Sequence, residues 1–142
     1  MKKIYLAAPL FNPQEIAYNQ AVCQVLEQFF EVHLPQRDGV LIPGNAKDVD
    51  QFRQMSAQAY ESDLAAIRDC DIVFAVLDGR SIDEGVSFEL GYGVALGKCC
   101  VGLLTDRRVL LPHGINPMIA CGLVDVLTAF EAVAPWAEGL KT

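Results

Sequence analysis

The segment DIVFAVLDGRSIDEGVSFELGYG (71–93) contains the pattern that decides the fold. Its first part, residues 72–77, is an uninterrupted apolar run, which is typical of a strand buried on both faces in a parallel sheet. A charged loop follows, and then Val86, Leu90 and Val94 recur at helical spacing. Ligands of open α/β sheets bind beyond the carboxyl ends of the strands, so this junction is predicted to form a pocket wall.

Glu89 is the charged residue of this segment with the most suggestive position. It is expected in the first turn of the helix that follows the loop. A carboxylate there lies near the positive end of the helix dipole, which favours its ionised form. Glu89 is therefore predicted to act as an anion, and the alternative is a solvated glutamate with no chemical role.

The composition of the 142-residue chain fits one domain over residues 1–142. With 52% hydrophobic and 20% charged residues, part of the apolar surface is expected in a subunit interface. The net charge of −7 argues against nucleic acid polymers and anionic membranes as partners. The apolar run after Lys2 and Lys3 is too short for a signal peptide or a membrane span, so we expect a cytoplasmic protein.

Cysteine and histidine provide little support for metal or thiol chemistry. The five cysteines lack C-x-x-C spacing, and the adjacent Cys99 and Cys100 are expected in the core, on opposite faces of a strand. The two histidines are His33 and His113, so a zinc site or a Cys/His nucleophile pair is poorly supported. No metal or organic cofactor is therefore expected.

Apolar runs and helical periodicity alternate along the rest of the chain. Strands are expected at residues 3–8, 31–35, 71–78, 99–105 and 123–127. Helices are expected after the N-cap Asn12, from about Asp48 to Asp69, from the charged loop to Gly97, from Pro117 and over residues 129–140, with a long loop at 36–47. This order predicts an α/β fold, a three-layer sandwich with a five-stranded parallel sheet of the Rossmann or flavodoxin-like type.

Asp63 is an acid on an apolar stripe, because Met55, Ala59 and Ile67 share its helix face. An unpaired ionised group there is unfavourable, so Asp63 has partners, lines a cavity, or is protonated with a raised pKa. The alternative is a hydrated edge position or a structural hydrogen bond to a loop.

Short motifs in a fixed order coincide over most of the chain. They are Tyr5 in the first strand, Asp63 before the central strand, Leu77–Arg80, Asp83–Gly85, Phe88–Tyr92 with Glu89 six residues after Asp83, and Asn116–Met118. In this order and spacing, the chain resembles the nucleoside 2-deoxyribosyltransferase family.

The resemblance implies a pentosyltransferase that exchanges the base of a 2′-deoxyribonucleoside for a free nucleobase. Glu89 matches the nucleophile that attacks C1′ and forms a covalent glycosyl ester, and Asp63 matches the acid that exchanges a proton with the base. Tyr5 matches a tyrosine that holds the nucleophile by hydrogen bonding. Asp83 matches an aspartate at the sugar hydroxyls.

The resemblance also implies at least a dimer, because Asn116 and Met118 match residues that reach the 5′ end of the sugar in a neighbouring subunit's site. Further substrate contacts are expected from loops and a helix start at the carboxyl ends of the strands: Phe11, Asp78, Arg80 and Gly85. Arg37 and Asp38 are additional candidates on the base side. The preference between purines and pyrimidines stays open.

This mechanism agrees with the chemistry of the residues themselves. Double displacement at an anomeric carbon needs one ionised nucleophile and one proton donor. Glu89 at a helix N-terminus is expected to provide the first, and Asp63 on an apolar face the second.

Two other functions remain open. The related hydrolases of deoxynucleoside 5′-monophosphates keep both acids but use hydroxyl residues for the phosphate, where this chain has Asp83. An aspartate repels a phosphate and accepts from a sugar hydroxyl, which favours free nucleosides, although Ser87 and the loop arginines suit the hydrolase. The other possibility is a nucleotide-binding module without catalysis on the same fold.

Overall fold

A computed structural model describes residues 1–42, 48–106, 108 and 114–141. Within these residues, five strands pair in parallel in the order β2-β1-β3-β4-β5. The strands are β1 (Lys3–Ala7), β2 (Glu31–His33), β3 (Ile72–Val76), β4 (Cys99–Leu103) and β5 (Asp125–Leu127). The prediction of an α/β fold with a five-stranded parallel sheet is confirmed.

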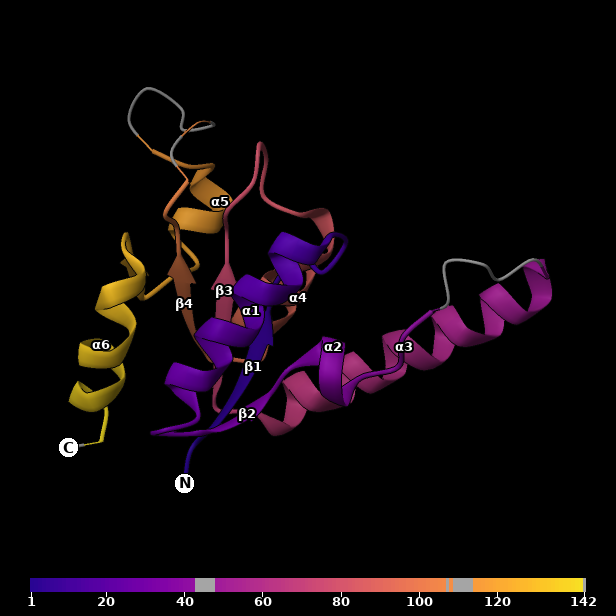
Figure 1. The fold of residues 1–142 in the computed structure, drawn as a ribbon, viewed down its shortest axis with the longest axis horizontal. Helices are drawn as coiled ribbons and strands as arrows, with labels where there is room; N and C mark the ends of the chain where they lie inside the picture. Colours follow the sequence, from indigo (N-terminus) through magenta and orange to yellow (C-terminus); the bar gives the residue numbers. More distant parts are fainter. Residues whose placement is uncertain (43–47, 107, 109–113, 142) are drawn as a thin grey trace.

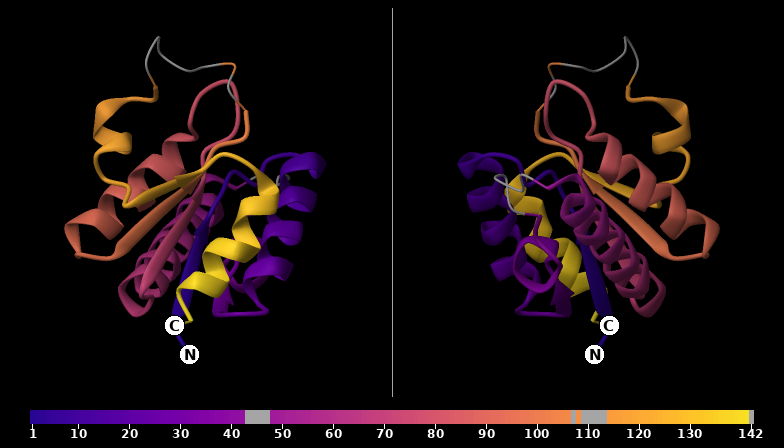
Figure 2. Two further views of the ribbon diagram at one scale, coloured as in Figure 1. Left: turned by 90° about the vertical axis from the view of Figure 1, so that its left-hand side faces the viewer. Right: turned by 90° about the vertical axis from the view of Figure 1, so that its right-hand side faces the viewer.

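Helices cover both faces of this sheet (Figures 1 and 2). They are α1 (Pro13–Leu26), α2 (Pro35–Asp38), α3 (Val49–Asp69), α4 (Glu84–Ala95), α5 (Pro117–Ala120) and α6 (Val133–Gly139), with a 3₁₀ turn, η1 (Phe130–Ala132), before α6. Helices α1 and α6 pack on one face, and α3 and α4 pack on the other. The layers follow from the alternation of strand and helix in the sequence.

The sheet separates two hydrophobic clusters, because successive residues of a strand point to opposite faces. Leu6 and Phe74 belong to the cluster under α1 and α6, whereas Tyr5 and Cys100 belong to the cluster under α3 and α4. Cys99 packs against the first cluster, so the two adjacent cysteines face opposite sides as expected. All five residues of β3 are buried, which explains the uninterrupted apolar run.

Helix α4 begins at Glu84, earlier than the sequence pattern suggested. The Asp83 side chain caps it, with Oδ2 accepting from the backbone N–H of Val86 at 3.0 Å. Glu89 therefore lies in the second turn, and the prediction of a first-turn position is wrong. A Cβ added to Gly93 would lie 2.7 Å from Cγ2 of Val73, so glycine permits the close contact of α4 with β3.

The loop after β2 also departs from expectation. Pro35 does not only end the strand; it opens the short helix α2, consistent with the preference of proline for the first helical position. The predicted loop 36–47 is therefore partly helical at its start, and residues 43–47 lie outside the described part of the chain. The caps predicted at Asn12 and Asn116 are both confirmed.

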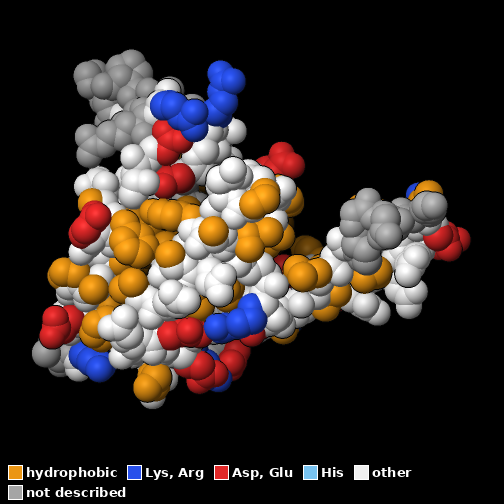
Figure 3. Space-filling view, in the orientation of Figure 1, with side chains coloured by type: hydrophobic (Ala, Val, Ile, Leu, Met, Phe, Trp, Pro, Cys, Tyr) orange, Lys and Arg blue, Asp and Glu red, His pale blue; other side chains and the backbone are white. Residues whose placement is uncertain are grey.

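Helix α3 extends well beyond the sheet as an arm (Figures 1 and 3). Its outer half presents Val49 and Phe52 to solvent, 62% and 49% exposed. Across the residues placed by the structure, no helix is both long and apolar enough to cross a bilayer.

Candidate active site

Three candidate catalytic side chains lie near one another on the face of the sheet covered by α3 and α4. Tyr5 comes from β1, Asp63 from α3 and Glu89 from α4. Burial raises the pKa of the Tyr5 phenol far above its ordinary value, and the negative charges of Glu89 and Asp63 raise it further. The structure thus brings together the three residues that the sequence analysis assigned to catalysis.

Glu89 has a different electrostatic environment from the one predicted. Burial raises its pKa to about 7, the neighbouring Tyr5 hydroxyl opposes this rise, and the charges of Asp63 and Asp83 add to it. The helix dipole therefore does not hold the pKa of Glu89 at or below its ordinary value. The second-turn position moves the carboxyl away from the free N–H groups of the first turn, and desolvation dominates.

Asp63 follows the prediction more closely. Burial raises its pKa, while the imidazole of His33 and the hydroxyl of Tyr5 lower it. Because Asp63 and Glu89 are near enough to repel each other as anions, the pair favours a single negative charge. With a single negative charge, one acid can be the carboxylate that a nucleophile needs while the other is the protonated acid that a proton donor needs.

Two buried oxygens of this site have no hydrogen-bond partner among the described residues. They are the hydroxyl of Tyr5 and Oε2 of Glu89. The Tyr5 hydroxyl approaches Glu89 and Asp63 closely enough to affect their pKa values without completing a hydrogen bond of normal geometry. Buried polar atoms are normally paired, so these two atoms mark a place where a ligand can bind.

Asp83 and Gly85 adjoin Glu89 at the start of α4. A Cβ added to Gly85 would lie 3.1 Å from Oδ2 of Asp83 and 4.0 Å from Oε1 of Glu89. A larger residue at position 85 would therefore crowd both carboxyl groups. The N-cap hydrogen bond explains part of the presence of Asp83, and its charge also acts on Glu89.

Some of the remaining predicted substrate contacts surround a cavity of about 280 Å³ beyond the strand ends. Its lining includes Phe11, Asp78, Arg80 and Asp83. Phe11 is 77% exposed, so its ring is free to contact a ligand. Asp78 is engaged by the protein itself, because it accepts from the backbone N–H groups of Thr105 at 2.6 Å and Asp106 at 2.9 Å, and from the Thr105 hydroxyl.

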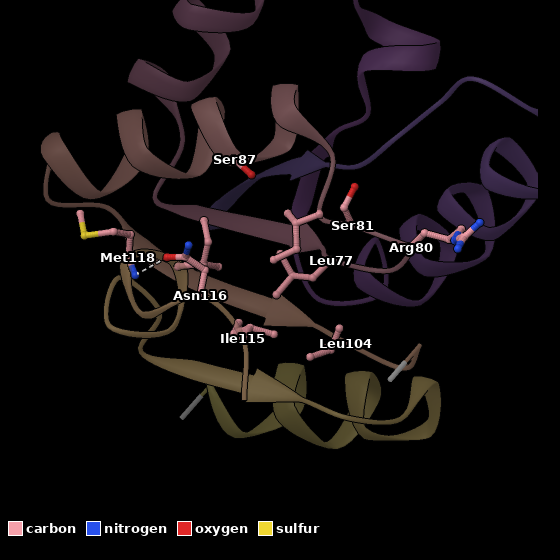
Figure 4. Close-up of a pocket in the computed structure, with 10 residues that line it drawn as sticks. Leu77, Arg80, Ser81, Ser87, Leu104, Ile115, Asn116 and Met118 are labelled. Atoms are coloured by element: carbon pink, nitrogen blue, oxygen red, sulfur yellow. Dashed lines mark hydrogen bonds between the residues drawn. The ribbon is translucent and has the colours of Figure 1, made fainter. Parts of the chain in front are cut away.

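Asn116 and Met118 line a separate cavity of about 560 Å³ beside α4, together with Arg80 and Ser87 (Figure 4). Oδ1 of Asn116 accepts from the backbone N–H of Met118, and the Met118 side chain is 85% exposed. Glu89 does not line this cavity. Glu89 is also absent from the lining of the cavity that includes Phe11 and Arg80.

The loop candidates Arg37 and Asp38 mainly stabilise the region around α2. Arg37 donates to Glu27 at 2.6 Å and to Asp38 at 2.9 Å, and Asp38 accepts from the backbone N–H of Leu34 at 2.9 Å. These contacts explain both charges without a ligand.

His33 is a site residue that the sequence analysis missed. Its ring stacks on Tyr5, with ring centroids 5.5 Å apart and planes 13° apart. The pairing of the first two predicted strands could have indicated this contact, because Tyr5 and His33 are register partners on β1 and β2. In the part of the chain that is described, no three His, Cys, Asp or Glu side chains group as metal ligands.

The fold and the site define an α/β protein with two acids and a tyrosine grouped on one face of a parallel sheet. Residues 4–133 match the sequence model of the family described as Nucleoside 2-deoxyribosyltransferase. A nucleoside deoxyribosyltransferase of Limosilactobacillus fermentum is 31% identical over 127 residues, which cover 85% of this chain and 76% of that protein. The chain belongs to the nucleoside 2-deoxyribosyltransferase family, as its resemblance predicted.

Solved structures share this fold. The 2-deoxyribosyltransferase of Bacillus psychrosaccharolyticus superposes with a TM-score of 0.74 at 26% identity, covering 93% of this chain and 90% of its own. The CMP N-glycosidase of Clostridium botulinum shares the fold, with a TM-score of 0.58 at 18% identity over 99% of this chain and all of its own.

Proposed function

We propose that the protein exchanges the base of a 2′-deoxyribonucleoside for another nucleobase by double displacement on Glu89. Family membership supports the reaction class. The observation that carries the proposal is the buried, unpaired Oε2 of Glu89 beside Tyr5 and Asp63, as far as the described residues extend. A nucleophile and a proton-exchanging acid in one place are the two groups that retention at an anomeric carbon requires.

In the first step, the Glu89 carboxylate forms a bond to C1′ while the bond from C1′ to the base nitrogen breaks. Asp63 gives its proton to the departing base, which leaves as the neutral free base. In the second step, a new base loses its N–H proton to the Asp63 carboxylate and attacks C1′, and Glu89 leaves as a carboxylate. Atoms and charge balance, because the negative charge moves from Glu89 to Asp63 and back.

Phe11, Arg80 and Asp83 are the side chains we assign to substrate binding. They share a cavity beyond the strand ends, and Gly85 keeps the space beside Asp83 and Glu89 open. The Asp83 carboxylate can accept from a sugar hydroxyl and disfavours a phosphate at the same position. Free nucleosides are therefore the proposed substrates.

A second copy of the chain is proposed to complete the site with its own Asn116 and Met118. The support is that these two residues line a cavity whose lining does not include Glu89, and that Met118 and Phe88 are 85% and 53% exposed. Mixing two inactive variants, Glu89→Gln and Met118→Ala with Asn116→Ala, tests this proposal. Activity recovered in the mixture supports a shared site, whereas a mixture with only the summed residual rates contradicts it.

A nucleotide N-glycosidase is the second candidate. The observation that favours it is the cavity beside α4, where Arg80, Ser81 and Ser87 offer one positive charge and two hydroxyl groups. Such a set suits a phosphate better than the carboxylate of Asp83 does.

The test is incubation with a 2′-deoxyribonucleoside and a second free base, followed by chromatography of the products. Formation of the new nucleoside supports the transferase. Release of base without exchange supports the hydrolase, particularly if only the 5′-monophosphate reacts. Neither product, with binding of the nucleoside retained, supports a binding module and contradicts the proposal.

A further inference from the structure

The Phe11 ring lies at the candidate substrate cavity with little packing to hold it there. It is 77% exposed and lines the cavity of about 280 Å³ beyond the strand ends. None of the aromatic ring pairs among the described residues includes Phe11. A ring with few neighbouring atoms gains little from dispersion, so the contacts of its backbone decide its location.

Two side chains of α1 hold the backbone of this segment. Nδ2 of Asn19 donates to the carbonyl oxygen of Pro9 at 2.8 Å, and Asn19 is only 1% exposed. Oε1 of Glu15 accepts from the backbone N–H of Phe11 at 3.0 Å. Burial strengthens the first hydrogen bond, and a charged acceptor strengthens the second. The segment before α1 is therefore tied to the helix at Pro9 and again at Phe11.

The hydrogen bond between Phe11 and Glu15 is not explained by helix capping. In a capping box, the side chain of the third helical residue accepts from the backbone N–H of the N-cap residue. The N-cap of α1 is Asn12, and its own Oδ1 accepts from the backbone N–H of Glu15 at 2.9 Å. The Glu15 side chain reaches one residue further, to an N–H that precedes the helix. This hydrogen bond therefore orders the residue that carries the exposed ring.

We propose that Glu15 is a positioning residue that fixes the Phe11 ring at the cavity before a substrate binds. A ring already held in place can contact a nucleobase without first ordering its own backbone, which makes binding tighter. Glu15 also lines the cavity, so a direct contact between its charge and the substrate is the alternative. The inference rests on the proposed function, but the hydrogen bond to Phe11 can be tested without a ligand.

The first test is the exchange rate of the Phe11 amide hydrogen, measured by NMR in the protein without ligand. In Glu15→Ala this amide loses its acceptor, so its exchange should be about tenfold faster. Glu15→Gln keeps an acceptor oxygen and should restore the wild-type rate. Gln14→Ala, an exposed change in the same turn of α1, is the matched control and should leave the rate unchanged. An unchanged rate in Glu15→Ala overturns the proposal, whether or not the protein is a transferase.

The second test is calorimetric titration with 2′-deoxyribonucleosides in the Glu89→Gln background, which removes the nucleophile. Glu15→Ala is expected to raise the Kd about tenfold, the factor that corresponds to ordering the backbone of one residue. Phe11→Ala should raise the Kd by at least as much. The two changes together should raise it no further than Phe11→Ala alone, because Glu15 acts through Phe11. Glu15→Gln should bind as tightly as the background protein.

Two results of the titration overturn the proposal. Additive losses in the double variant indicate that Glu15 acts independently of Phe11. A loss in Glu15→Gln equal to that in Glu15→Ala indicates a direct contact between the Glu15 charge and the substrate. If Glu15→Ala does not fold, Glu15→Met takes its place, since it keeps the length of the side chain and has no oxygen. If the background protein binds no nucleoside, the proposed function fails and amide exchange still decides whether Glu15 holds Phe11.

Discussion

Asp78 and Glu89 are carboxyl groups near the same edge of the sheet, yet the protein surrounds them in opposite ways. Asp78 accepts hydrogen bonds from the loop after β4, including the backbone N–H groups of Thr105 and Asp106. Oε2 of Glu89 accepts none from the described residues, and burial raises the pKa of Glu89 to about 7. A carboxylate whose acceptors are occupied stabilises a loop, whereas a buried and unpaired one is available for chemistry.

Substitution of Glu89, the carboxyl group with an unpaired oxygen, is expected to have the largest effect on base exchange. Glu89→Gln removes the nucleophile while keeping the shape of the side chain, so base exchange should fall by at least about 10³-fold. Glu138→Gln, an exposed change of the same kind on α6, is the control and should keep most activity. Product chromatography measures both. An exchange rate in Glu89→Gln within tenfold of the wild type would remove Glu89 from the mechanism.

Asp63→Asn is expected to have the next largest effect. The amide cannot donate an acidic proton, so exchange should slow by about 10²-fold. The loss should be greatest for bases that leave poorly as anions and smallest for bases with acidic N–H groups. Rates measured with a series of bases give this dependence, and an equal loss for every base would contradict a proton-donating role.

The pH dependence of folding stability gives a further test of the burial of Glu89. The folded pKa of Glu89, about 7, lies above its unfolded value near 4.5, so the folded state binds the extra proton. Stability from this group is therefore complete below about pH 4.5 and is lost as the pH rises through 7. Glu89→Gln should be more stable than the wild type by about 2–3 kcal/mol at pH 8, and nearly equal at pH 4.5. Urea unfolding at the two pH values measures this, and a difference independent of pH would contradict a buried acid.

Asp78→Asn is expected to show the smallest effect and the opposite pattern. The amide oxygen can still accept the two backbone hydrogen bonds made to Oδ1, but the amide nitrogen replaces Oδ2, the acceptor of the Thr105 hydroxyl, so the free energy of unfolding should fall by about 1 kcal/mol. Exchange should change by less than tenfold, because the charge is used by the loop. If this variant keeps its stability in urea and loses exchange as Glu89→Gln does, the roles of the two acids are reversed.

The sheet and its helices could be predicted because their signals are local. The apolar run of β3 reflects burial on both faces, and the caps Asn12 and Asn116 satisfy backbone groups within a few residues. The short helix α2 was missed because four residues contain too little periodicity to distinguish a helix from a loop.

The family resemblance predicted that Tyr5, Asp63 and Glu89 lie together. The raised pKa of Glu89 did not follow from the sequence. The pKa of Glu89 depends on side chains from β1 and α3 that are distant along the chain. The helix dipole acts only along α4, whereas burial by the surrounding elements raises the pKa of Glu89. The position of His33 beside Tyr5 was missed for the same reason, since it depends on the pairing of β1 with β2.

Mass spectrometry of the protein quenched during turnover tests the central claim most directly. After mixing with a 2′-deoxyribonucleoside and acid quenching, the proteolytic peptide that contains Glu89 should gain the mass of one deoxyribosyl group, and the peptide from Glu89→Gln should not. Exchange that proceeds with no adduct, or with the adduct on another residue, would contradict double displacement on Glu89.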